Sequence, residues 1–562
     1  MKKFDKFFEG LELKAYELFG AHKKENGVEF TVFAPEAKQV EVYMSSNWAN
    51  YIKLNKIDQR GIWQVFIDDI EPYYLYKYRF WINNRDYVEK SDPFAYTYEI
   101  APKDSSIIYD LDYYHFTDDD YINKKEPLNI YELHINSFKK EEDSFYASYR
   151  DLKSTLVPYL KDNNFNCLNL MPIFEYKGDE TLGIKSSAFF APSSRFGTPY
   201  DFMDLINEMH QNNIKVILDV NYYDFAKNDN LMEKLDGGYL YESDDNLRFD
   251  YSKGYVCSFL LSSIELFINR YHIDGFKLLN VDKMTDKENT NGQKFLKLLV
   301  SSVKHFHPEV LLISDYQSNE MKNPVSHGGY GFDFLICDEC VANVINALDN
   351  KKPFSIVKNT SNKNILPLRF ELSKNKPLIE RFKVEYDEKF AIYRMLMTFL
   401  YTWPGNKLIY AGIEMGMSRS FDYKRGLDWS LLSYPMHDSL KEYIKVLGEL
   451  YLNTAALNSD KLNIVDDTDV KAYYLNDDKK LYMVVINTSD KVLKDYVVFA
   501  PYAASYKAVV NSDQINYGGQ GILGTNELKT RSINKKPCLK LDLNKYSAIV
   551  LSCKYYNKKT QK

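Results

Sequence analysis

Residues 215–279 decide the fold class, because they hold KVILDV (215–220), VCSFLLSSIELFINRYH (256–272) and IDGFKLL (273–279) in that order. The first and third runs are short and apolar, as in buried strands, and the longer run between them has the pattern of an amphipathic helix. A helix that connects two buried strands indicates a β-α-β unit with its strands parallel in one sheet. The chain is therefore predicted to have an α/β fold.

The same alternation continues on both sides of this unit and gives eight β-type runs in total. Eight parallel strands joined by helices predict a (β/α)8 barrel with insertions. The runs outside the first unit are NIYELHI (129–135), a helix near 150–162, CLNLM (167–171), a helix PYDFMDLINEMHQ (199–211), VLLIS (310–314), FDFLI (332–336), LPLRFEL (366–372) and KLIYAG (407–412).

The two ends of the chain have a different pattern. Short alternating runs from Gly27 to Tyr109 are split by Asn, Asp, Gly and Pro, and this predicts a small antiparallel β-sandwich. Alternating strands return near the C-terminus and predict a second β-sandwich. The expected domains are residues 1–115, 116–457 and 458–562.

Charge and hydropathy narrow the classes of partner. The formal net charge is -6, and acidic and basic residues are mixed along the chain, so neither a nucleic acid nor an anionic membrane is expected as a partner. A neutral partner such as a carbohydrate fits better. The N-terminal residues lack the uninterrupted apolar stretch of a secretory signal, and no later run approaches a membrane span, so a cytoplasmic location is expected.

The six cysteines do not suggest a disulfide framework, because they are scattered over a long chain. Cys337 and Cys340 form a lone CxxC that could supply half of a zinc site, but no second pair or His-rich tract completes four ligands. No metal and no cofactor are therefore predicted.

A set of longer phrases is more specific than the architecture, and together they resemble glycogen branching enzyme, the 1,4-α-glucan branching enzyme of the α-amylase superfamily (glycoside hydrolase family 13). The resemblance covers nearly the whole chain and implies an N-terminal glucan-binding module, a catalytic barrel and a terminal β-sandwich. The phrases are FFEGLELKAYELFGAH (7–22), VEFTVFAPEAKQVEVYM (28–44), SDPFAYTYEIAP (91–102), IYELHINSF (130–138), FFAPSSRFGTPYDF (189–202), YHIDGF (271–276), HGGYGFDF (327–334), TWPGNKLIYAGIEMG (402–416), GLDWSLLSYPMH (426–437) and NSDQINYGGQG (511–521).

The resemblance implies a retaining transfer of a glucan chain from an α-1,4 to an α-1,6 position. Such a double displacement needs a carboxylate nucleophile and a second carboxyl group as acid and base, about 5 Å apart. In a (β/α)8 barrel these groups stand at the C-terminal ends of strands.

The nucleophile is missing from its expected position. After the fourth strand the family has an arginine, one further residue and the nucleophilic aspartate, and these positions hold Lys277 and Leu279 here. Leucine has no lone pair with which to attack a sugar carbon. Asp274 and Asp282 stand elsewhere in this segment, so neither is expected to replace the nucleophile.

Two further catalytic positions differ from the family. Asp315 stands at the acid/base position in place of glutamate and is shorter by about 1.5 Å of reach. A misplacement of about 1 Å can already cost about a hundredfold in rate. Lys374 and Asn375 are taken to stand where the family has the His-Asp pair that stabilises the transition state, so a negative charge is lost and a positive one added.

The sugar-contacting positions change in the same direction. Asp219 matches the family's aspartate after the third strand, but Asp224 stands where a histidine is expected. The family's Trp-Gly-Tyr becomes Leu182, Gly183 and Ile184, which removes an aromatic surface for the sugar. The losses therefore gather at one face of the barrel while the scaffold phrases remain.

Structural roles are open for several of these residues. Asp219 and Asp315 could be strand-end carboxylates bonded to backbone amides rather than ligands. Lys277 and Lys374 are more simply interpreted as ion-paired lysines than as catalytic groups. In that case a salt-bridge network would stand where the family has its catalytic site. Trp48, in a segment similar to the family's sugar-facing loop, is either a residual glucan contact or ordinary core.

Three functional hypotheses follow from the sequence. The leading one is a catalytically silent homologue of glycogen branching enzyme that binds α-glucan or associates with other enzymes of glycogen metabolism. The second is an active branching enzyme or weak α-glucan hydrolase that uses unanticipated groups. The third is a structural or interaction role without sugar binding.

Overall fold

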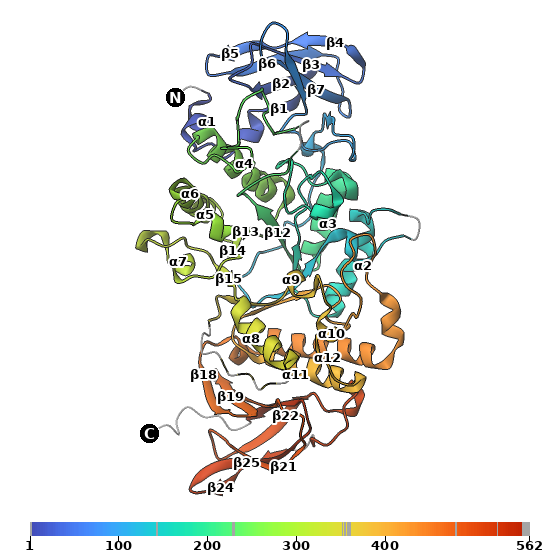
Figure 1. The fold of residues 1–562 in the computed structure, drawn as a ribbon, viewed down its shortest axis with the longest axis vertical. Coiled ribbons are helices and arrows are strands. Elements are labelled where there is room, and N and C mark those ends of the chain that lie inside the picture. Colours follow the sequence, from blue (N-terminus) through green and yellow to red (C-terminus); the bar gives the residue numbers. More distant parts are fainter. Residues whose placement is uncertain are drawn as a thin grey trace.

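The computed structural model describes residues 3–141, 144–227, 231–350, 352, 354, 356, 361–477, 480–524 and 527–553. An N-terminal β-domain, a central barrel and a C-terminal β-domain follow one another along the long axis of the molecule (Figure 1). The predicted three-part α/β architecture is thereby confirmed. Residues 554–562, which end the third predicted domain, lie outside the described residues.

The barrel is a closed sheet whose eight strands follow chain order from β10 to β17, and all neighbours pair in parallel. Its strands are β10 (Asn129–Leu133), β11 (Cys167–Leu170), β12 (Lys215–Asn221), β13 (Gly275–Leu279), β14 (Leu311–Ser314), β15 (Phe334–Ile336), β16 (Asn364–Leu368) and β17 (Asn406–Tyr410). Its longer helices are α2 (Tyr149–Asp162), α3 (Pro199–Gln211), α4 (Gly254–Tyr271), α6 (Thr290–Phe306), α8 (Asp338–Asp349), α11 (Tyr386–Thr402) and α12 (Pro435–Leu452).

The interior of the barrel is layered, because alternate residues of a strand face the same side of the sheet. The lower layer is a separate buried apolar cluster that takes side chains from strands all around the barrel, among them Ile130, Cys167, Ile217, Ile313, Ile365 and Leu408. Two residues further along the first four strands stand the buried polar residues Glu132, Asn169, Asp219 and Lys277. The interior therefore changes from apolar to polar toward the C-terminal ends of its strands.

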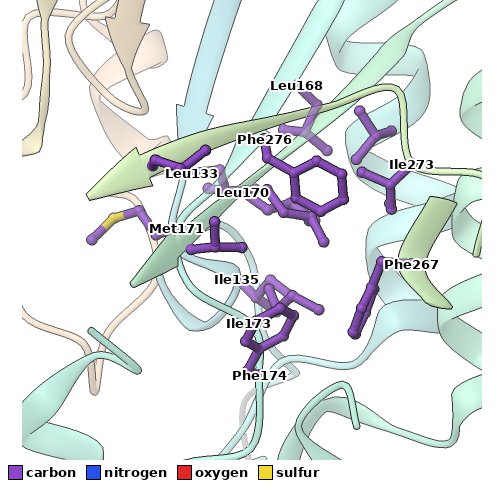
Figure 2. Close-up of a cluster of buried hydrophobic side chains, with 14 of the residues drawn as sticks. Leu133, Ile135, Leu168, Leu170, Met171, Ile173, Phe174, Phe267, Ile273 and Phe276 are labelled. Atoms are coloured by element: carbon purple, nitrogen blue, oxygen red, sulfur yellow. The ribbon is translucent and has the colours of Figure 1, made fainter. Parts of the chain in front are cut away.

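The outward-facing residues of the same strands form the core under the helices. Figure 2 shows Leu133 of β10, Leu168 and Leu170 of β11 and Phe276 of β13 converging with Phe267 of α4. All five side chains are fully buried. This outer core keeps its apolar pattern, so the scaffold is intact independently of what occupies the barrel mouth.

The N-terminal β-domain consists of two antiparallel sheets, as the alternating pattern predicted. One sheet has the order β1-β2-β6-β5 and the other β4-β3-β7-β8, with β9 paired to β7. Their bounds are β1 (Gly20–Lys24), β2 (Gly27–Phe33), β3 (Gln39–Met44), β4 (Asn47–Lys53), β5 (Asn55–Asp58), β6 (Ile62–Asp68), β7 (Leu75–Trp81), β8 (Tyr87–Lys90) and β9 (Ser106–Ile107).

The C-terminal β-domain also has two antiparallel sheets, with a core of its own. One sheet has the order β18-β19-β20-β26-β22-β23 and the other β21-β25-β24. Their bounds are β18 (Leu462–Asp467), β19 (Val470–Asn476), β20 (Leu481–Asn487), β21 (Leu493–Phe499), β22 (Ser505–Asn511), β23 (Leu528–Lys529), β24 (Arg531–Ile533), β25 (Lys536–Leu543) and β26 (Ser547–Cys553).

The start of the chain docks on helix α4 of the barrel. Helix α1 (Asp5–Glu9) contacts α4, and a Cβ atom at Gly254 would meet the Phe8 carbonyl oxygen at 2.1 Å, so only glycine allows this approach. Ser262 of α4 accepts a hydrogen bond of 2.8 Å from the backbone amide of Ala15. Apolar packing and backbone hydrogen bonds thus fix the first residues of the chain on the barrel.

A buried histidine fixes the segment that leads into the barrel. His210, at the end of α3, lies 2.6 Å from Asp118 and 3.0 Å from Asp274, and His272 also contacts Asp118. Burial alone would lower the pKa of His210, but its hydrogen bonds to the two carboxylates raise that pKa to about 9. A protonated imidazole therefore donates to both carboxylates and joins the segment to the barrel.

Replacing this histidine is predicted to remove a pH-dependent part of the stability. Because the folded pKa of about 9 lies above the ordinary 6.5, the contribution is complete below pH 6.5 and disappears as the pH rises through 9. His210→Gln should lower the free energy of unfolding by about 3 kcal/mol at pH 6 and by much less at pH 10. Thermal unfolding midpoints across this range test it, with the exposed His327→Gln as control. A constant difference between wild type and His210→Gln at all pH values would contradict it.

Candidate functional site at the barrel mouth

A buried lysine bridges two carboxylates in the polar layer of the barrel. Lys277 Nζ lies 2.7 Å from Glu132 Oε1 and 3.1 Å from Asp219 Oδ2, and all three side chains are at most 5% exposed. Asp219 also accepts a 2.7 Å hydrogen bond from Asn169, and Glu132 accepts one of 2.8 Å from the amide of Phe370. Four neighbouring strands and the segment after β16 are thus tied together by one ammonium group.

The ionisation of this cluster reflects its burial. Desolvation and the neighbouring Glu132 raise the pKa of Asp219 above its ordinary value, although Lys277 acts in the opposite direction. Burial by itself would lower the pKa of Lys277, but the attraction of Asp219 and Glu132 raises it above its ordinary value. Lys277 is therefore a permanent cation held between two acids, and such a group is not free to attack a sugar.

Leu279 lies at the mouth itself. It stands two residues beyond Lys277 on β13, so it faces the same side of the barrel, and it pairs with Asn221 of β12. Its side chain is half-buried. Position 279, where the sequence analysis expects the nucleophile, is therefore a hydrocarbon next to the polar layer.

Asp315, directly after β14, is half-buried and bound to backbone amides. Its carboxylate accepts hydrogen bonds from Asn280 N at 2.8 Å and from Val281 N at 3.1 Å. Burial raises its pKa to about 6, although the two amides act in the opposite direction. Asp315 could thus release a proton near neutral pH, but its oxygens also hold the turn that follows Leu279.

Lys374 and Asn375, which the sequence analysis places at the His-Asp position, stand six and seven residues after the end of β16 at Leu368. Lys374 follows the single-turn helix α9 (Phe370–Ser373), and both Lys374 and Asn375 are exposed. The structure does not bring these two residues together with Lys277 and Asp219. The residues that directly follow the strand are Arg369, Phe370 and Glu371.

Arg369 links two acids at this end of the barrel. Its guanidinium lies 2.5 Å from Asp338, which opens α8, and 3.3 Å from Glu371. Glu371 acts electrostatically on Lys277, and Arg369 on Asp315. The salt-bridge network that the lysines suggested is present, with Lys277 and Arg369 as its cations rather than Lys374.

Two of the positions expected to contact sugar, Ile184 and Asp224, are joined through Asn221, the last residue of β12. Asp224 pairs with Lys185 at 2.6 Å and accepts a 2.8 Å hydrogen bond from Asn221. The same Asn221 side chain donates 2.9 Å to the backbone oxygen of Ile184. Asp224 and Ile184 therefore belong to one connected loop structure, and position 184 carries no aromatic ring.

Trp48 lies in the N-terminal domain on β4 and is 41% exposed. Its ring stands edge-on to Tyr43 at 5.5 Å, and Tyr43 lies 5.0 Å from Tyr51. Arg79 is sandwiched between Tyr51 and Tyr87, with its guanidinium carbon 3.8 and 4.1 Å from their ring centres. The outer face of this sheet is thus a continuous aromatic surface, and Trp48 is not ordinary core.

Two further features concern metal binding and membrane spans. Cys337 and Cys340 are both buried. Within the described residues, no group of three or more His, Cys, Asp or Glu side chains could hold a metal ion. The described helices include none with the length and hydropathy needed to cross a membrane.

Comparison with known proteins identifies the family of the chain. Residues 18–95 match Carbohydrate-binding module 48 (Isoamylase N-terminal domain), and residues 464–554 match Alpha amylase, C-terminal all-beta domain. The chain is 32% identical to the 1,4-alpha-glucan branching enzyme GlgB of Geobacillus stearothermophilus, over 94% of this chain and 90% of the relative. It is 30% identical to the same enzyme of Bacillus subtilis (strain 168), over 95% and 94%.

The chain belongs to the 1,4-alpha-glucan branching enzyme family. The resemblance inferred from its phrases is thereby confirmed. Solved structures share the fold of this branching-enzyme homologue. One is the catalytic module of the glycogen-degrading pneumococcal virulence factor SpuA, which has a TM-score of 0.73 at 17% identity and covers 95% of this chain and 96% of that one. A pullulanase from Anoxybacillus sp. LM18-11 complexed with maltotetraose has a TM-score of 0.74 at 16% identity, covering 95% and 87%.

Sequence reasoning missed four residues of the mouth in this branching-enzyme homologue. Glu132, Asp338, Arg369 and Glu371 come from β10 or from segments after β15 and β16, and all act on Lys277 or on its partners. Glu132 could have been found, because it is the one charged residue within the run that forms β10. Arg369 gave no such signal, because its pairing with Asp338 and Glu371 can be seen only in the folded barrel.

Removing the shared cation is predicted to destabilise the barrel strongly. Lys277→Met would leave Glu132 and Asp219 buried without a counter-charge, at a cost of about 3–5 kcal/mol. Adding Glu132→Gln and Asp219→Asn to the same variant should recover more than half of this loss. Thermal and urea unfolding measure both effects. Equal midpoints for Lys277→Met and wild type would show that the cluster does not bear on stability.

Proposed function

We propose that this protein is a branching-enzyme homologue without glucan-transfer activity, whose role is to bind α-glucan. The observation that carries the proposal is Leu279 at the nucleophile position, directly above the bridge from Lys277 to Glu132 and Asp219. A carboxylate at that position is the minimum that a retaining transfer needs.

The electrostatics of the mouth support the same proposal. The transition state of glucan transfer carries developing positive charge at the sugar ring, which fixed negative groups stabilise. Here Glu132 and Asp219 face Lys277, and Asp338 and Glu371 face Arg369. Each of these four acids is therefore paired with an internal cation, so none of them stands at the mouth as an unpaired carboxylate.

Glucan binding is supported by the N-terminal domain. It matches a carbohydrate-binding module, and the outer face of its β4-β3-β7-β8 sheet carries the aromatic surface around Trp48. Aromatic rings present flat apolar faces, and a half-exposed tryptophan beside tyrosines suits stacking against a sugar ring. An α-glucan is thus the partner proposed, together with other enzymes of glycogen metabolism that act on the same polymer.

The alternative is that activity remains. Asp315 has a raised pKa and could act as a general acid, and Glu371 directly follows the seventh strand as a carboxylate. The relatives that the chain matches are named 1,4-alpha-glucan branching enzymes. Activity of this kind would have to proceed without a carboxylate at position 279.

An activity measurement separates these two possibilities. Purified protein incubated with amylose is expected to leave the iodine colour unchanged and to create no new reducing ends or α-1,6 branches above a heat-killed blank. Loss of a member of a cooperating catalytic set lowers turnover by about 10⁴ to 10⁶-fold. Turnover above the blank would reject the proposal.

Restoring one carboxylate is not expected to restore transfer. Leu279→Asp would place a third acid beside Lys277, while Asp315 stays bound to the amides of Asn280 and Val281. The same amylose assay is predicted to give less than about 1% of the activity of an active relative, consistent with the misplacement of the remaining groups. Robust branching by this single variant would contradict the account of the mouth.

Binding to glycogen should depend on the aromatic surface. On a native gel that contains glycogen, the wild-type protein is expected to be retarded, and Trp48→Ala should abolish most of the retardation. Phe66→Ala is the matched control, because Phe66 is 45% exposed on β6 in the other sheet of the same domain. Equal migration of wild type with and without glycogen would favour a role without sugar binding.

A further inference from the structure

A large cavity lies at the end of the barrel opposite the mouth. It has a volume of about 800 Å³, and its wall includes Leu128, Leu311, Phe334 and Asn406. These residues precede or begin strands β10, β14, β15 and β17, so the cavity lies at the N-terminal ends of the strands. Substrates of (β/α)8 enzymes bind at the C-terminal ends, so this cavity is separate from the glucan site.

The floor of the cavity is apolar. Leu128, Val300, Leu311 and Phe332 are buried residues with their side chains against it, and Tyr451 adds an aromatic ring. The volume falls within the range of about 300–1,000 Å³ that is usual for small-molecule sites. An apolar or aromatic group of a ligand would therefore find a surface on which to pack.

The wall of the cavity is cationic, although the whole chain has a net charge of -6. Five lysines stand around it, against two carboxylates, Glu126 and Asp333. Both carboxylates are already engaged: Glu126 pairs with Lys215 at 2.8 Å, and Asp333 pairs with Lys304. The remaining lysines leave an excess of positive charge, which would attract an anion.

Backbone and side-chain bonds hold two of these lysines at the cavity. Tyr121 donates a 2.9 Å hydrogen bond to Asp274, and Asn123 donates to the carbonyls of Asp274 and Glu309 at 3.1 and 3.0 Å. At the other end of this segment, the amide of Leu128 donates 2.9 Å to the side chain of Asn406. Lys124 and Lys125 lie between these fixed points, so their backbone position is set before any ligand binds.

Another lysine stands on the opposite wall. Lys322, at the end of α7 (Asn319–Lys322), donates a 3.0 Å hydrogen bond to Asn364 at the start of β16. Lys304 of α6 is fixed by its pair with Asp333, and Lys363 stands next to Asn364. Positive groups therefore reach the cavity from four separate segments, which suits a ligand with several anionic oxygens.

We propose that this cavity binds a phosphorylated small molecule with an aromatic or apolar part, such as a nucleoside phosphate. The lysines would contact the phosphate oxygens and the apolar floor would pack against the base. A lone phosphate would fill only a small part of the volume. Since the site lies away from the barrel mouth, its ligand acts as an effector and not as a substrate, whether or not the proposed glucan binding holds.

Calorimetric titration of the full chain at low salt tests this proposal, with ATP, adenosine and inorganic phosphate as separate probes. ATP is expected to bind at one site, and adenosine and phosphate each at least tenfold more weakly. Lys124→Glu combined with Lys125→Glu should weaken ATP binding at least tenfold. The matched control changes Lys535 and Lys536, an adjacent exposed pair in the C-terminal domain, to glutamate and should leave the affinity unchanged.

A second variant tests the volume of the cavity without changing its charge. Ser301 is an exposed residue of α6 on the cavity wall, so Ser301→Trp should fill the space and abolish ATP binding while the thermal midpoint stays at the wild-type value. The proposal is overturned if ATP shows no saturable binding at millimolar concentration, or if both lysine double variants bind ATP equally. Equal affinity for phosphate and ATP would overturn the role of the apolar floor.

Discussion

One ammonium group in the barrel interior holds the first four strands in place. Lys277 bridges Glu132 and Asp219, and through their hydrogen bonds it reaches Asn169 and the backbone after β16. A single lysine cannot leave this position without stranding two buried acids, which would cost far more than an exposed ion pair contributes. The polar layer is therefore both a structural joint and the floor of the mouth.

This joint supports the proposal that the mouth does not transfer glucan, although the scaffold is well formed. The carboxylates at the mouth are each bound by a partner within the protein: Asp219 by Lys277, Asp315 by two amides, Asp224 by Lys185 and Asp338 by Arg369. Groups engaged in this way stabilise the ends of the strands instead of facing a substrate. The outer apolar core in Figure 2 does not depend on these carboxylates, so the barrel can form whatever residues stand at its mouth.

The two faces of the barrel consequently offer different surfaces. At the C-terminal ends of the strands, carboxylates pair with Lys277 and Arg369, and the aromatic sheet that carries Trp48 is the surface proposed for sugar binding. At the N-terminal ends, lysines exceed carboxylates around an apolar cavity. A protein with this distribution can bind two chemically unlike ligands without the two sites competing.

The sequence by itself determined the eight-strand barrel, the flanking β-domains and the family, because hydrophobic periodicity and long phrases are local properties of the chain. The helix expected at 199–211 has those bounds. The spacing of Leu279 from Asp274 and Lys277 was enough to place it at the expected nucleophile position. Only the tertiary structure decided that Arg369 and Glu371, rather than Lys374 and Asn375, stand at the end of β16, and that Glu132 shares Lys277 with Asp219. The physical reason is that the partners of a buried charge come from strands far apart in the chain, and the closure of the barrel alone brings them within hydrogen-bonding distance.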